Sequence, residues 1–136
     1  MIYKFKIQIS NLKMTMQNSK FKKEFILRLV NFSIDIIKFC ELLKNEKYFL
    51  VIIDQLLRSA TSIGANVIEA KSSSSKTEYL RYFQIALKSA NETKYWLFII
   101  LKTTKDNKEK INQLLRETEE IANILAAGIL TMKGKK

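Results

Sequence analysis

Apolar residues recur at spacings of three and four along most of this chain, and no proline interrupts the pattern. Between residues 21 and 43 the spacing is 4-3-4-3-4, which is the repeat of one helix face. Neighbouring apolar residues widen this face beyond what a two-stranded coiled coil needs, so the helix must contact more than one partner. The chain therefore predicts a helical bundle. The main row is Phe25, Leu29, Phe32, Ile36, Phe39 and Leu43, widened by Ile26, Val30, Ile37 and Cys40.

Three further segments show the same periodicity. We expect helices over about 49–71, from residue 76 to beyond 101, and from about 108 to 132. The polar connections between them are short, and short connections join antiparallel neighbours. The sequence thus predicts an all-α fold, an up-down-up-down four-helix bundle over residues 21–132. It is preceded by a basic leader, 1–20, and followed by a basic tail, 133–136.

Local signals mark two of the helix starts. Ser75 and Glu78 have the spacing of a capping box, in which the serine hydroxyl accepts from the N3 amide and the glutamate reaches back. The segment 106–109 predicts a second cap of the same kind. Gly64 lies inside the second helix, where it predicts a kink or a close helix contact.

Composition excludes several classes of function. The chain has 136 residues, one cysteine and no histidine, which leaves no intrachain disulfide and no plausible zinc, haem or di-iron ligand set. Cys40 has no histidine to act as a base, so we interpret it as a core residue. No apolar run reaches the roughly 18 residues of a membrane span. We therefore expect a cytoplasmic protein without cofactor, metal or membrane partner.

The net charge of +11 is concentrated near the two ends of the sequence. The body, residues 24–132, has 15 basic and 13 acidic residues, a net charge of only +2. Basic arms of this kind bind phosphate or acidic surfaces. A compositional origin stays open, because 20 lysines against 4 arginines is also typical of an AT-rich genome. The candidate nucleic-acid-binding residues are Lys4, Lys6, Lys13, Lys20, Lys22, Lys23, Lys133, Lys135 and Lys136.

Residues 2–10 alternate between apolar and polar, which is the period of a strand. A lone strand has no sheet to join. Three interpretations stay open: the leader pairs with another subunit, it is loosely ordered, or Met14 or Met16 is the natural start.

A row of polar residues follows one face of the second predicted helix, beside the apolar residues Ile63 and Val67. Its side chains can form a hydrogen-bonded network with polar residues of the third helix. Two interpretations are open. Such a network fixes the helix register or a subunit interface, or it forms a surface that binds a polar ligand or nucleic acid. Acid–base catalysis by its glutamates would lack a pocket, a nucleophile and a metal. We call the polar row Arg58, Ser59, Ser62, Asn66 and Glu69, with Ser89 and Glu92 on the third helix.

Exposed aromatic side chains can stack on unpaired bases, but helical spacing favours packing in a core or an interface. Tyr82 and Trp96 are fourteen residues apart on the third predicted helix, so they point in similar directions. We expect both at a contact between subunits.

The sequence resembles the four-helix-bundle family encoded within intervening sequences of bacterial 23S ribosomal RNA genes, which is also described as ribosomal-protein-like. That family's second helix contains approximately R-x-A-x-S-I-x-x-N-I-x-E-G, followed by S-x-x-E-[FY], and its third helix contains F-x-x-x-A-x-x-S-x-x-E. The matching residues are Arg58, Ala60, Ser62, Ile63, Asn66, Val67, Glu69, Ser75, Glu78, Tyr79, Phe83, Ala86, Ser89 and Glu92, with Ala86 one residue closer to Phe83 than in the family pattern. Gly64 and Ala70 stand where the family often has proline and glycine, and residues 1–15 have no counterpart.

The resemblance implies a homopentameric barrel and no enzymatic activity. It also implies a relation to bundle proteins that act as nucleic-acid-binding accessory factors in retroelements. We therefore expect a non-enzymatic homo-oligomer whose basic ends bind RNA or DNA. The alternative is a protein-interaction scaffold that does not bind nucleic acid.

Overall fold

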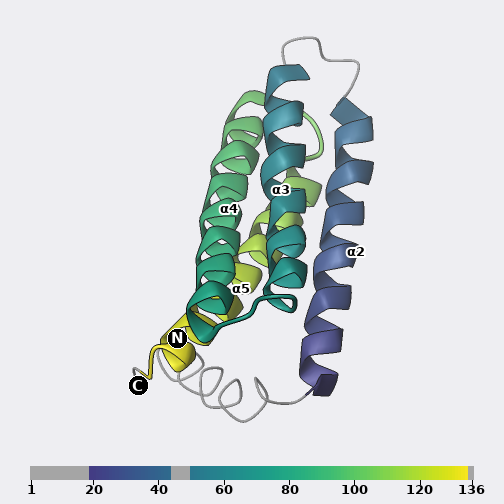
Figure 1. Ribbon diagram of the computed structural model, residues 1–136. Coiled ribbons are helices and arrows are strands. Elements are labelled where there is room, and N and C mark those ends of the chain that lie inside the picture. The colour runs from purple at the N-terminus through teal and green to yellow at the C-terminus, as the bar shows by residue number, and fades with distance from the viewer. Residues whose placement is uncertain (1–18, 44–49, 135–136) are drawn as a thin grey trace, which may run out of the picture.

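The computed structural model describes residues 19–43 and 50–134, and these residues form four helices. They are α2 (Ser19–Leu43), α3 (Leu50–Ala70), α4 (Lys76–Thr103) and α5 (Lys108–Met132). Successive helices run in opposite directions, with α2 and α4 on opposite sides of the bundle and α5 behind α3 (Figure 1). The predicted all-α four-helix bundle is confirmed. The strand-like pattern at 2–10 and five of the candidate lysines, Lys4, Lys6, Lys13, Lys135 and Lys136, lie outside the described residues.

The core consists of the apolar rows that the periodicity predicted. All six residues of the main α2 row are buried, as are Leu56, Ala60 and Ile63 of α3. Burial of a large apolar side chain contributes about 1.5–3 kcal/mol relative to exposure, so this row is the main source of α2 docking. Of the residues predicted to widen the row, Cys40 is buried, whereas Val30 and Ile37 are exposed.

The four helices do not contact one another equally. α4 packs along both α3 and α5, and α2 packs chiefly on α3 and touches α5 little. Gly64 faces α2, where a Cβ atom would lie 3.5 Å from Leu29 Cβ. The predicted close helix contact is therefore present, and α3 is one continuous helix through this glycine.

The helix ends agree with the predicted boundaries but only partly with the predicted caps. Ser75 is the N-cap of α4, and its Oγ accepts from the amide of Glu78 at 3.1 Å. The Glu78 carboxylate accepts from Ser74 rather than from the Ser75 amide. At α5 the cap prediction is wrong: Asn107 adopts a left-handed backbone (φ 65°) and its side chain caps nothing.

The described helices and their side chains provide neither a membrane span nor a metal-binding cluster. None of its helices is both long and apolar enough to cross a bilayer. Residues 19–43 and 50–134 also contain no group of three or more cysteine or carboxylate side chains arranged to hold a metal ion.

Candidate functional site

The buried part of the polar row is a pair of hydroxyl groups between α3 and α4. Ser59 is 3% exposed and Thr93 is fully buried. Thr93 Oγ1 lies 3.0 Å from Ser59 Oγ and 2.8 Å from the carbonyl oxygen of Ser89. Ser59 in turn donates to the carbonyl oxygen of Leu56 at 3.2 Å. Both hydroxyls are therefore satisfied, which buried polar groups require.

A second, half-buried group continues the row toward the end of α3. Ser89 Oγ donates to Ser62 Oγ at 3.0 Å, which joins α4 to α3. Asn66 Nδ2 donates to Ser62 Oγ at 2.9 Å and to the Ser62 carbonyl oxygen at 2.8 Å. Four residues of the predicted row, Ser59, Ser62, Asn66 and Ser89, thus form hydrogen bonds in the interface between these two helices.

The charged residues of the row are not part of this network. Arg58, Glu69 and Glu92 are exposed, and Arg58 pairs with Asp54 one turn earlier at 3.0 Å. The prediction that Arg58, Glu69 and Glu92 belong to the network is therefore wrong within the chain. At 100° per residue, Arg58 and Glu69 lie at the edge of the α3 face that contains Ser59, about 100° and 80° around the axis from it. Their long side chains reach water from there.

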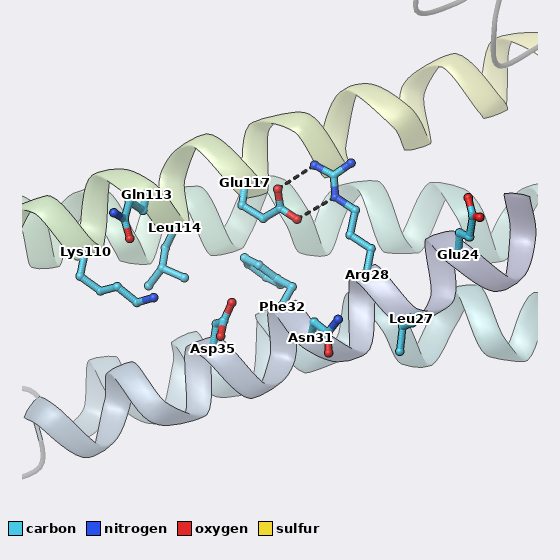
Figure 2. A pocket seen from close by; sticks show the side chains of 10 residues that line it. All are labelled: Glu24, Leu27, Arg28, Asn31, Phe32, Asp35, Lys110, Gln113, Leu114 and Glu117. Carbon is cyan, nitrogen blue, oxygen red and sulfur yellow. Dashed lines mark hydrogen bonds and ion pairs between the residues drawn. The ribbon is translucent and has the colours of Figure 1, made fainter.

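Sequence reasoning missed an ion-pair cluster between α2 and α5. Arg28 donates to both carboxylate oxygens of Glu117 at 2.7 Å and to Glu120 at 2.6 Å. These bonds outweigh the partial burial of the guanidinium and raise the pKa of Arg28 further above its usual value. The cluster lies at a groove of about 470 Å³, whose floor includes Phe32 (Figure 2). It tethers the two helices where their direct packing is sparse.

The four candidate lysines within the described residues gather at one end of the bundle. Lys20, Lys22 and Lys23 lie in the first turns of α2, and Lys133 follows α5. The beginnings of α2 and α4 and the end of α5 share this end (Figure 1). Lys22 Nζ lies 5.8 Å from the centre of the Tyr79 ring of α4, which confirms the proximity.

The fold adds two lysines from the middle of the sequence to this end. Lys71 follows α3 and Lys76 begins α4, so both lie at the same end of the bundle. Lys22 and Lys76 line a groove of about 550 Å³ together with the hydroxyls of Ser73, Ser74 and Ser75. The described lysines of this end are Lys20, Lys22, Lys23, Lys71, Lys76 and Lys133, against the acids Glu24, Glu69 and Glu78.

Two helices expose rows of apolar side chains on opposite sides of the molecule. The α2 outer row is Leu27, Val30, Ile34 and Ile37, each 41–59% exposed. The α4 outer row consists of three exposed apolar side chains, Ile85, Tyr95 and Phe98, and the exposed polar residues between and beside them, Lys88, Asn91 and Lys102. In contrast, Tyr82 and Trp96 are half-buried against the core, and Trp96 Nε1 is buried without a hydrogen-bond partner. Exposed apolar rows of this size are typical of interaction surfaces.

These features define an all-α, four-helix-bundle protein with a hydroxyl-lined α3–α4 interface, a basic end and unpaired apolar rows. The model of the 23S rRNA-intervening sequence protein family matches residues 22–127. The chain belongs to that family.

A similar solved structure is the 1.70 Å crystal structure of a protein of unknown function from the S23 ribosomal protein family of Bacteroides thetaiotaomicron VPI-5482. It is 34% identical, with a TM-score of 0.73, and the match covers 77% of this chain and 97% of that chain. No curated protein matches this chain.

Proposed function

We propose that this protein is a non-enzymatic homo-oligomer of the cytoplasm that binds nucleic acid through its basic end, in association with ribosomal RNA intervening sequences. One observation supports this most strongly. Lysines from the start of α2, from the α3–α4 turn and from the residue after α5 all lie at the same end of the bundle. Lysine ammonium groups neutralise phosphates and release condensed counterions, which is the main source of sequence-independent affinity. Contacts of this kind confer little sequence preference.

Oligomerisation makes this proposal stronger. The α2 and α4 outer rows leave large apolar side chains in water that a subunit contact would cover. A cyclic oligomer repeats the basic end once per subunit on one rim. Several weak contacts acting together then give avidity without any new type of contact. The family resemblance makes five subunits the simplest size to expect.

The test is nucleic-acid binding by two variants with the same charge change. The first has Lys22→Gln, Lys23→Gln and Lys133→Gln at the basic end. The matched control has Lys105→Gln, Lys108→Gln and Lys110→Gln at the opposite end of the bundle, around the α4–α5 connection. Fluorescence anisotropy with labelled single-stranded and duplex RNA, and with the same DNA sequences, is measured at low and moderate salt.

We expect the first variant to bind at least tenfold more weakly than the control at low salt, and with a smaller salt dependence. Each lost phosphate contact should lower the slope of log K against log salt by about 0.7–0.9. Equal weakening by both variants would mean that net charge alone determines binding. No binding by the native protein would favour the alternative, a protein-interaction scaffold.

A chain trimmed to residues 16–132 separates the leader and the tail from the bundle itself. If the lysines of the leader and the tail, Lys133 included, contribute, this chain binds more weakly than the full chain at low salt. Equal affinity of the trimmed and full chains would limit the interface to the lysines of 19–132.

A further inference from the structure

The groove at the basic end is lined by lysines from two helices on opposite sides of the bundle. Lys22 belongs to α2 and Lys76 to α4 (Figure 1). Its described lining residues include no aspartate or glutamate. Glu78, two residues after Lys76, accepts from Ser74 at 3.0 Å and lines a different pocket. We call this 550 Å³ site the basic groove; it is lined by Lys22, Ser73, Ser74, Ser75, Lys76, Tyr79, Thr131 and Met132.

The hydrogen-bonding groups of the basic groove favour a phosphate over a neutral ligand. The ammonium groups of its two lysines can only donate. Ser75 Oγ accepts from the amide of Glu78, and its own proton has no acceptor among the described residues. The hydroxyls of Ser73 and Thr131 already donate to carbonyl oxygens of Ala70 and Ala127. The groups left for a ligand are therefore mainly donors, and phosphate oxygens only accept.

The aromatic side chains near the basic groove pack within the bundle. Phe21, Tyr79 and Tyr82 lie against the core. Phe83 stacks on the Tyr79 ring with the ring centres 5.0 Å apart, and Lys22 Nζ lies over the same ring at 5.8 Å. Tyr79 is thus occupied by contacts within the chain and does not present an open face to a base.

The exposed aromatic side chains lie far from the basic groove. At 1.5 Å per residue, Tyr95 and Phe98 lie about 24 and 28 Å beyond Tyr79 along α4. Proteins that bind single-stranded nucleic acid combine a cationic groove with aromatic faces on which the bases stack. In the described part of this chain the two features are separated. Base stacking therefore adds nothing to affinity at the basic groove.

The lysines of the basic end form a two-dimensional array, because they come from the ends of all four helices. Neighbouring helices of a bundle lie about 8–10 Å apart, so helices at opposite corners lie about 11–14 Å apart. A single strand offers one row of phosphates. A duplex offers two rows, which flank a groove about 12 Å wide in B-form DNA. Lysines at opposite corners can therefore reach both strands of a duplex at once.

We propose that the basic end binds a nucleic-acid duplex through its phosphates, with one strand seated in the basic groove. This rests on the proposed nucleic-acid binding and names its substrate class. A duplex has a high charge density, about one charge per 1.7 Å of axis, and releases more counterion per phosphate contact than a single strand does. RNA and DNA duplexes share this chemistry, and the paired bases are not read.

The primary test uses the native full chain and no substitution. Fluorescence anisotropy measures its affinity for labelled single strands and for blunt duplexes of the same length and sequence, as RNA and as DNA. We expect duplex affinity to exceed single-strand affinity by about tenfold at low salt, with a steeper slope of log K against log salt. A ratio no greater than twofold, which a second strand gives by number alone, would overturn the duplex preference and leave nucleic-acid binding intact. Binding to neither probe would overturn both proposals. The RNA and DNA probes show which duplex is preferred.

Two pairs of substitutions locate the strand. Lys22→Gln with Lys76→Gln changes the basic groove, and Lys23→Gln with Lys133→Gln makes the same charge change at the same end outside its lining. We expect the groove pair to weaken duplex binding at least threefold more than the control pair does. Equal weakening would overturn the seat in the groove.

Tyr79→Leu removes the aromatic ring and keeps an apolar side chain against Phe83. The ratio of duplex to single-strand affinity should stay within about twofold of the native ratio, because Tyr79 does not stack on bases. A selective loss of single-strand affinity in this variant would contradict the proposal.

Discussion

Replacing Thr93 by valine removes the hydroxyl that joins α3 to α4 in the core and keeps the branched shape of the side chain. The Thr93 hydroxyl has one proton and two acceptors within reach, Ser59 Oγ at 3.0 Å and the Ser89 carbonyl oxygen at 2.8 Å. A net intramolecular hydrogen bond contributes about 0.5–1.5 kcal/mol, and the added methyl group recovers part of that by apolar burial. The single substitution therefore changes stability by an amount too small to interpret alone.

A double-mutant cycle isolates the bond. Ser59→Ala, Thr93→Val and the double variant are unfolded with urea at one protein concentration, because the proposed assembly would make stability depend on concentration. We expect a coupling energy of about 0.5–1.5 kcal/mol between the two sites. The control cycle pairs Ser59→Ala with Thr103→Val, an exposed hydroxyl that bonds within its own helix. It should be additive to within about 0.5 kcal/mol. A coupling for Ser59 and Thr93 no larger than the control would refute the buried hydroxyl pair.

Three further predictions concern single positions. Gly64→Ala should raise the free energy of unfolding by about 0.5–1 kcal/mol, since alanine favours the helix and its Cβ meets Leu29 at an ordinary contact distance of 3.5 Å; a lower urea midpoint would contradict this. Glu69→Ala should change that free energy by less than about 0.5 kcal/mol, because the side chain is exposed; a loss of 1–3 kcal/mol would indicate a subunit contact there. Cys40 should label slowly with maleimide at pH 7 and faster as the pH approaches its pKa of about 11, since the thiolate is the reactive form; rapid labelling of folded protein at pH 7 would contradict its burial.

The helices were predictable because apolar periodicity alone decides which face of a helix is buried. Every residue of the main α2 row lies in the core as its spacing required. The same rule did not separate the residues beside that row: Cys40 is buried, whereas Val30 and Ile37 are 42% and 47% exposed. Only the arrangement of the other helices decides this.

The α3–α4 hydroxyl network was predictable in part. Ser59, Ser62 and Asn66 share one side of α3, and Ser89 meets them across the helix interface. Thr93 was missed although it follows Ser89 by one helical turn, a spacing that would have identified it. Spacing alone did not predict that Arg58 and Glu69, which lie at the edge of the same α3 face, are exposed and outside the network.

The ion-pair cluster and the full basic end depend on which chain segments come together. Arg28 and Glu117 are 89 residues apart, and no local pattern relates them. The charge count of the chain ends identified Lys22 and Lys133, whereas Lys71 and Lys76 join them only because of the up-down-up-down topology.

The central claim is that basic ends repeated around an oligomer bind nucleic acid together. The most direct test compares the salt dependence of RNA binding by the native protein and by a Leu27→Gln, Ile34→Gln variant. These substitutions disrupt the α2 outer row without changing the net charge. The account predicts that the variant is smaller in solution, binds at least tenfold more weakly at low salt, and has a shallower slope of log K against log salt. A variant that is monomeric yet binds RNA with the native affinity and slope would contradict it.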